Sequence, residues 1–89
     1  MQQVTISVDC SCYMNDVESI NLLLKRKIIP LLKYHFNIIS ILTNGVFIEI
    51  HIDIENSYMD YCNICNYCRD LIQIILFDNG FDLIISVFT

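Results

Sequence analysis

Hydrophobic and polar residues alternate along residues 3 to 10. One side of this segment carries Val4, Ile6, Val8 and Cys10, and the other side carries polar residues. A period of two places successive side chains on opposite faces of a β-strand. The segment is therefore predicted to be a strand with one buried face.

The next segment repeats hydrophobic residues every three or four positions, as one face of an α-helix requires. Asn15 and Glu18 precede most of this pattern with the spacing of a capping box, which marks a helix start. The predicted buried stripe consists of Val17, Ile20, Leu24, Ile28 and Leu31. Pro30 lacks a backbone donor and clashes with the preceding turn, so a kink or break is expected near Ile29.

A hairpin is predicted over residues 38 to 54, because the pair Asn44-Gly45 interrupts two alternating runs. A type I′ loop at this pair would place Thr43 opposite Val46 and Leu42 opposite Phe47. Ile39, Ile41 and the alternate residues of the second strand would then face the core, and Ile38 would face the opposite side.

A second helix is predicted to begin at Ser57 with Asp60 and to end at Asn79-Gly80. Its predicted stripe consists of Tyr61, Cys65, Cys68, Ile72 and Ile75. Residues 81 to 88 alternate again and predict a last strand. Phe81, Leu83, Ile85 and Val87 would face inward, and Asp82, Ile84, Ser86 and Phe88 would face outward.

The predicted order is therefore β-α-β-β-α-β, in one α+β domain that covers residues 1 to 89. With right-handed crossovers, this order resembles the ferredoxin-like split β-α-β plait. That fold has a four-stranded antiparallel sheet in the order 4-1-3-2, with two helices on one face. The resemblance is to an architecture that hosts many unrelated functions, so it implies no activity.

Composition excludes several classes of protein. The 89 residues are 55% hydrophobic and 17% charged, which excludes intrinsic disorder. Five basic residues against ten acidic residues give a net charge of -5, so no direct binding of nucleic acid is expected. The longest uncharged stretch, residues 34 to 48, is too short to span a membrane, and no signal sequence is expected.

Five cysteines raise the question of a metal site: Cys10, Cys12, Cys62, Cys65 and Cys68. The last three resemble the start of a bacterial ferredoxin cluster motif, but they lie within a helical pattern and no fourth Cys-Pro follows. Cys65 and Cys68 are therefore expected to be small core residues. We expect no metal and no cofactor, and a thiol- or metal-based regulator is the alternative.

His51 and Asp53 form a second candidate site on one face of a predicted strand. Replication-initiator endonucleases carry a related His-hydrophobic-His motif with a tyrosine nucleophile on a following helix. Asp53 departs from that motif, although Tyr58, Tyr61 and Tyr67 follow it. A small metal-dependent nuclease is therefore a less favoured alternative, and no catalytic residue is expected.

The open face of the sheet is the most informative feature of the sequence. A solvent-facing sheet normally carries polar residues. Here five hydrophobic residues are predicted on it, and clusters of this kind mark interfaces. The predicted partner-binding residues are Ile38, Leu42, Phe47, Ile84 and Phe88.

The expected function is that of a non-enzymatic protein-binding module. It would bind another protein or form a homo-oligomer through the open sheet face or an edge strand. Abundant Ile, Asn, Tyr and Phe share AT-rich codons, which fits a small AT-rich genome such as that of a virus, a mobile element or a low-GC bacterium. The specific role we expect is a virus- or phage-encoded inhibitor of a host factor, such as an anti-CRISPR, in the cytoplasm.

Overall fold

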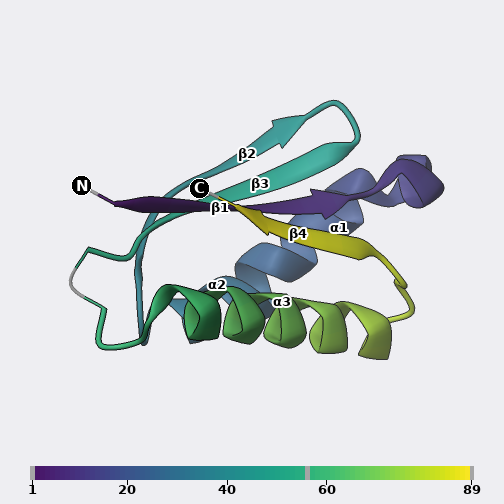
Figure 1. Ribbon diagram of the computed structural model, residues 1–89. Helices are drawn as coiled ribbons and strands as arrows, with labels where there is room; N and C mark the ends of the chain where they lie inside the picture. The colour runs from purple at the N-terminus through teal and green to yellow at the C-terminus, as the bar shows by residue number, and fades with distance from the viewer. Residues whose placement is uncertain (1, 56, 89) are drawn as a thin grey trace.

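The computed structural model describes residues 2–55 and 57–88, which form a four-stranded antiparallel sheet with helices packed on one side (Figure 1). The strand order across the sheet is β2-β3-β1-β4. The predicted α+β class and the predicted antiparallel sheet are confirmed. In chain order the elements are β1 (Gln3–Asp9), the 3-10 helix η1 (Ser11–Asp16), α1 (Val17–Leu23), the π-helix η2 (Leu24–Ile28), α2 (Ile29–Leu32), β2 (Asn37–Asn44), β3 (Phe47–Asp53), α3 (Tyr61–Asp78) and β4 (Ile84–Phe88).

The core lies between the sheet and the helices. The two central strands, β1 and β3, each contribute alternate residues that are completely buried, and Ile6 lies directly opposite Ile50. These alternate residues are the ones that the period of two predicted. The buried residues of β1 and β3 are Val4, Ile6, Val8, Ile48, Ile50 and Ile52.

The first helical segment begins differently from the prediction. The expected capping box at Asn15 and Glu18 is absent, because η1 occupies residues 11 to 16 and Asp16 is the N-cap of α1. The Asp16 side chain makes no capping hydrogen bond. A tight 3-10 turn therefore leads into α1 in place of a side-chain cap.

The break expected near Pro30 takes the form of the π-helix η2. The backbone N–H of Ile29 bonds to the carbonyl of Leu24, five residues earlier. This adds one residue to the turn and rotates the residues that follow it. As a result Leu31 is 40% exposed, whereas its neighbour Leu32 is completely buried. The prediction that Leu31 belongs to the buried stripe is therefore wrong.

The hairpin turn between β2 and β3 differs by one position from the prediction. The turn residues are Gly45 and Val46, and Asn44 lies opposite Phe47. Gly45 has a φ of 62°, and no described residue other than glycine has a positive φ. A positive φ at the first turn position alone is typical of a type II′ turn, so the type I′ prediction is wrong. Leu42 consequently lies opposite Glu49, not opposite Phe47.

A second irregularity lies in β2, which is an edge strand. The register with β3 shifts between Ile38 and Ser40, so a β-bulge occurs at Ile39. Ile38 pairs with the buried Ile52 and packs against the core, whereas Ile39 is exposed. The prediction had Ile39 facing the core and Ile38 on the open face. The extra residue of the bulge reverses these two orientations.

The start of α3 lies at Asp60, three residues later than the predicted start at Ser57. The Asp60 carboxylate accepts a hydrogen bond from the Asn63 backbone N–H at 2.9 Å, as an N-cap does. The Ser57 hydroxyl accepts a bond from the Met59 N–H instead. The buried residues of α3 are Ile64, Cys65, Cys68, Ile72 and Leu76, whereas Tyr61 is exposed and Ile75 is only half-buried.

The end of α3 agrees with the prediction. Gly80 has a φ of 92°, and its N–H bonds to the carbonyl of Phe77. The N–H of Phe81 bonds to the carbonyl of Leu76. These two bonds make a Schellman motif, which directs the chain back toward β4.

Candidate functional site

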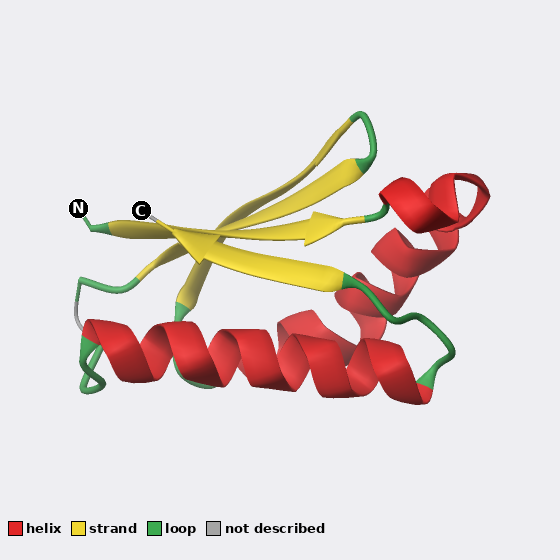
Figure 2. Ribbon diagram, turned by 45° about the vertical axis from the view of Figure 1, so that its right-hand side comes forward, coloured by secondary structure: helices red, strands yellow, loops and turns green. Residues whose placement is uncertain are grey.

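The open face is the side of the sheet that points away from the helices, which lie together on the opposite side (Figure 2). Strand pairing fixes which residues are neighbours on this face. Starting at the hairpin, the rows across β2, β3, β1 and β4 are Asn44, Phe47, Asp9 and Ile84; then Leu42, Glu49, Ser7 and Ser86; then Ser40, His51, Thr5 and Phe88; and finally Asn37, Asp53 and Gln3.

Four of the five predicted interface residues lie on the open face and are exposed. Their exposed fractions are 52% for Leu42, 42% for Phe47, 69% for Ile84 and 48% for Phe88. Phe47 and Ile84 lie in the same row on either side of Asp9. The fifth residue, Ile38, is wrongly placed by the prediction, because the β-bulge turns it toward the core.

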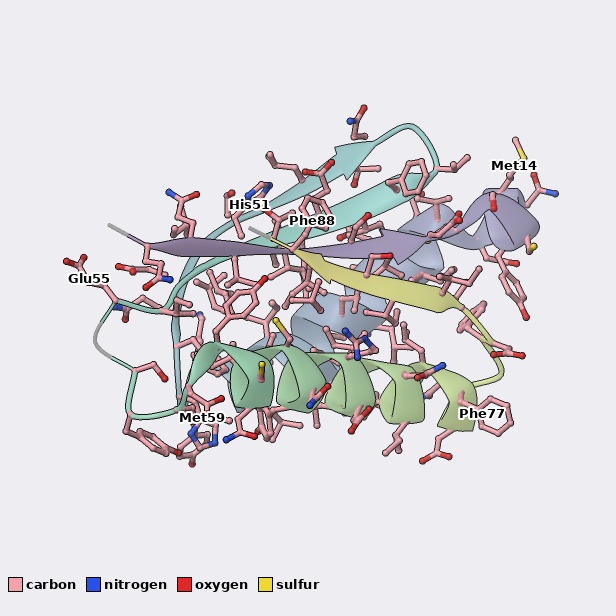
Figure 3. The ribbon with its side chains drawn as sticks, viewed as in Figure 1. Met14, His51, Glu55, Met59, Phe77 and Phe88 are labelled. Carbon is pink, nitrogen blue, oxygen red and sulfur yellow. The ribbon has the colours of Figure 1, made fainter. Side chains whose placement is uncertain are left out.

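A hydrogen-bonded chain crosses the middle of the open face. Thr5 Oγ1 lies 3.2 Å from His51 Nδ1, and His51 Nε2 lies 3.2 Å from Glu49 Oε1. A carboxylate only accepts, so His51 Nε2 donates to Glu49, and the Thr5 hydroxyl, which can donate or accept, bonds to Nδ1. Figure 3 shows the His51 side chain on the side of the sheet away from α3. Both ring nitrogens are therefore engaged, and His51 is held in one orientation.

The basic side chains of the molecule lie in one of its two layers. The open face carries the carboxylates of Asp9, Glu49 and Asp53 and no Lys or Arg. The five Lys and Arg residues lie in the helical layer: Lys25, Arg26 and Lys27 in η2, Lys33 directly after α2, and Arg69 in α3. The open face is therefore apolar and acidic together.

Asp9 stays ionised to a lower pH than an ordinary aspartate. Its carboxylate accepts a hydrogen bond from the Ser11 backbone N–H at 2.9 Å. Hydrogen bonds from the backbone and side chain of Ser11 hold the pKa of Asp9 below its usual value, because they stabilise the charged form. The negative charge between Phe47 and Ile84 is thus a lasting property of this face.

The histidine–aspartate pair proposed for a nuclease has other contacts. His51 bonds to Glu49 and Thr5, as described above, and Asp53 accepts a bond from the Glu55 N–H at 2.9 Å. The Tyr58 hydroxyl lies 2.8 Å from Nδ1 of His35, which belongs to the segment between α2 and β2. The Tyr67 ring packs edge-on against His35 and Phe36.

The cysteines fall into a buried and an exposed set. Cys10, Cys65 and Cys68 are buried, in agreement with the prediction for the last two, whereas Cys12 and Cys62 are exposed. Among the described residues, no group of three or more His, Cys, Asp or Glu side chains is placed to hold a metal ion. Cys65 and Cys68 therefore act as small hydrophobic residues of α3.

The stability of the protein is expected to fall at alkaline pH because of Cys68. Burial, and secondarily the neighbouring Cys65, raises the pKa of the Cys68 thiol from 9.0 to about 12. Above pH 9 the thiol ionises in the unfolded chain but stays protonated in the folded chain. The unfolded state then binds fewer protons, so the free energy of unfolding should drop by about 1 kcal/mol between pH 8 and pH 10.

Urea denaturation at these two pH values measures this effect of Cys68. Cys68→Ala removes the thiol and should show a smaller drop between pH 8 and pH 10 than the unsubstituted chain. The drop that remains in the variant comes from other titrating groups. One of them is Cys10, because burial raises the pKa of its thiol as well. Equal drops in the two proteins would contradict the assignment to Cys68.

A second exposed apolar group lies on the helical layer and was not predicted. Ile74 and Phe77 project from α3 outside its buried face, and Figure 3 shows Phe77 pointing away from the sheet. Close by, a shallow depression of about 510 Å³ is lined by Pro30, Leu31 and Ile75 together with polar residues. The signal in the sequence is the run of residues 71 to 77, which is hydrophobic on more than one side of the helix.

Comparisons with known proteins give no relative: no family model, no curated protein and no solved structure matches the chain. Among the described residues, no helix has both the length and the apolar character needed to cross a membrane. Functional inference therefore depends on the geometry of the open face.

Proposed function

We propose that this protein is a non-enzymatic protein-binding module that acts through the open face of its sheet. The observation that carries the proposal is the exposure of Leu42, Phe47, Ile84 and Phe88 on a face that carries no helix. Burying such side chains against a partner is favourable, at roughly 25 cal/mol for each Å² of apolar surface. Leu42 lies diagonally from Phe47 on the neighbouring strand, and Ile84 shares the row of Phe47, so these three side chains lie at the same end of the face.

The fold we infer for this module is the ferredoxin-like plait. The element order, with helices between β1 and β2 and between β3 and β4, supports it. The sheet order β2-β3-β1-β4 with antiparallel neighbours supports it as well. In this arrangement both connections that contain helices cross the same side of the sheet, which leaves the other side for binding.

His51 lies in the middle of the open face. Glu49 and the Thr5 hydroxyl each bond to one of its two ring nitrogens, so the ring is held in one orientation. Its part in the proposed function is to order the polar middle of the surface. A rigid surface loses less conformational entropy when a partner binds.

The biological role we propose is that of a virus- or phage-encoded inhibitor that works in the cytoplasm of a host cell. The abundance of residues with AT-rich codons and the net charge of -5 support this role. An acidic surface is attracted to the basic nucleic-acid site of a target and competes there with nucleic acid. A homo-oligomer formed through the same face is the other assembly that the proposal includes.

The proposed interface is tested by a pair of matched double variants. Phe47→Ser with Ile84→Ser removes two apolar side chains from the open face. Ile74→Ser with Phe77→Ser removes another exposed pair, at 61% and 64% against 42% and 69% for Phe47 and Ile84, from α3. The tagged proteins are compared by light scattering for self-association and by affinity capture from lysate of the host cell.

Loss of captured partner, or of self-association, only in the Phe47 and Ile84 variant is the expected result. Both variants should keep the circular dichroism spectrum of the unsubstituted chain, because all four side chains are exposed. Loss only in the Ile74 and Phe77 variant would place the interface on the helical layer and refute the proposal. Unchanged mass and unchanged capture in both would also refute it.

A further inference from the structure

The hairpin end of the open face combines an aromatic ring with two carboxylates. Phe47 lies directly opposite Asp9 on β1, and Glu49 follows it by two residues on β3. Side chains at such positions lie about 5 Å and about 7 Å apart, respectively. The Phe47 ring is also exposed. Two acidic residues are therefore the neighbours of this ring, Asp9 across the strands and Glu49 along β3.

Both carboxylates keep the capacity to bind a partner. Asp9 uses one oxygen for the Ser11 N–H, and Glu49 uses one oxygen for His51 Nε2. A carboxylate has about four acceptor positions, so each retains positions for a donor from outside. These internal bonds also fix the carboxylates in place, because Asp9 is tied to the backbone and Glu49 to an oriented ring.

Charge favours a basic partner over a second copy of this chain at the hairpin end of the open face. Two open faces packed together at this end would bury the carboxylates of Asp9 and Glu49 of both copies on a surface whose strand rows carry no Lys or Arg. Association that brings like charges together and removes their water is unfavourable in free energy. The surface instead complements a positive, partly apolar partner.

We infer that the partner protein binds here through an arginine side chain that stacks on Phe47 between Asp9 and Glu49, an inference that rests on the proposed function. The guanidinium group is planar and weakly hydrated, it stacks on aromatic rings, and it donates two parallel bonds to a carboxylate. Lysine is a strongly hydrated point charge and lacks this geometry. Leu42 and Ile84 flank the position and supply apolar contacts.

The inference is tested with two labelled probes, a hexa-arginine and a hexa-lysine peptide, by fluorescence anisotropy at low salt. We expect the arginine peptide to bind more tightly than the lysine peptide. Phe47→Leu keeps an apolar side chain but removes the ring, and it should abolish this preference by weakening arginine binding about threefold. Equal binding of the two peptides to the unsubstituted chain would overturn the inference.

A charge-matched pair of variants separates this site from general attraction to an acidic protein. Asp9→Asn with Glu49→Gln is expected to weaken arginine binding about tenfold. Asp70→Asn with Asp78→Asn changes the net charge equally, but on α3, and should change binding less than about twofold, since exposed distant charges are screened. Equal losses in the two pairs would overturn the inference.

The natural partner distinguishes failure of this inference from failure of the proposed function. If Phe47→Ser with Ile84→Ser releases the partner but Asp9→Asn with Glu49→Gln retains it, the open face is the interface and the arginine contact is wrong. If both variants retain the partner, the proposed function itself fails. Release of the partner by both double variants would support the proposed function and the arginine contact together.

Discussion

Replacing Leu32 with aspartate is expected to prevent the chain from folding. Leu32 is completely buried where α2 meets the sheet layer, and no buried polar or charged side chain occurs in the described core. An aspartate there has no partner, so the loss should exceed about 4 kcal/mol, a large part of the stability of a small domain. Far-UV circular dichroism and urea titration measure the loss as a missing cooperative transition.

The matched control is Leu31→Asp, one residue earlier. Leu31 is largely exposed because the π-helix η2 has rotated it out of the buried stripe. This variant should fold and lose less than about 1 kcal/mol. If Leu31→Asp unfolds the protein and Leu32→Asp does not, the helix continues without the π turn, and the described register is wrong.

Ile50→Ala is expected to destabilise the protein by about 2 to 5 kcal/mol. Ile50 is completely buried at the centre of the sheet, between Ile6 on β1 and Ile41 on β2. Removing its side chain loses transfer free energy and leaves a cavity that rigid neighbouring strands cannot close. Chemical denaturation measures the change as a lower midpoint with an unchanged slope.

Ile84→Ala makes the same kind of truncation on the open face and serves as the comparison. Ile84 is exposed, so we expect a loss of less than about 0.5 kcal/mol. The pair of variants therefore tests whether the two faces of the sheet are assigned correctly. A similar loss in both would show that the open face is covered in the folded protein.

The strands whose backbone is regular were predictable from the sequence. In β3, Ile48, Ile50 and Ile52 alternate with polar residues, and all three are buried as expected. A regular strand can turn only one of its two sets of alternate residues toward the core. The hydrophobic set is the one that gains from burial, so its orientation is predictable. The same reason explains why Ile84 and Phe88 were correctly placed on the open face.

Positions next to an inserted residue could not be predicted in this way. The π turn in η2 and the bulge at Ile39 each add one residue to an otherwise regular element. A periodic pattern assumes constant spacing, so Leu31 and Ile38 were assigned to the wrong sides. Pro30 predicts an irregularity in the helix, but it does not predict that the preceding turn is a π-helix with one extra residue.

Contacts within the site were only partly predictable. His51 was expected to lie beside Asp53, which is two residues away on the same face of β3, but Glu49 is equally close in sequence on the other side. The structure joins His51 to Glu49, with Thr5 of β1 on the other ring nitrogen. Glu49 and Asp53 have the same spacing from His51 in the sequence. Which of them bonds to His51 depends on the side-chain rotamers and on the cross-strand pairing, and the spacing does not determine these.

The bulge in β2 has a consequence for polymerisation. This edge strand has eight residues, none of them charged, and three of its hydrophobic residues are isoleucine. A regular strand of that composition would be a template for fibril growth, because its unpaired backbone groups match those of any other extended chain. The extra residue at Ile39 breaks the even spacing of those groups, so a monomer arriving at this edge finds no continuous ladder to extend.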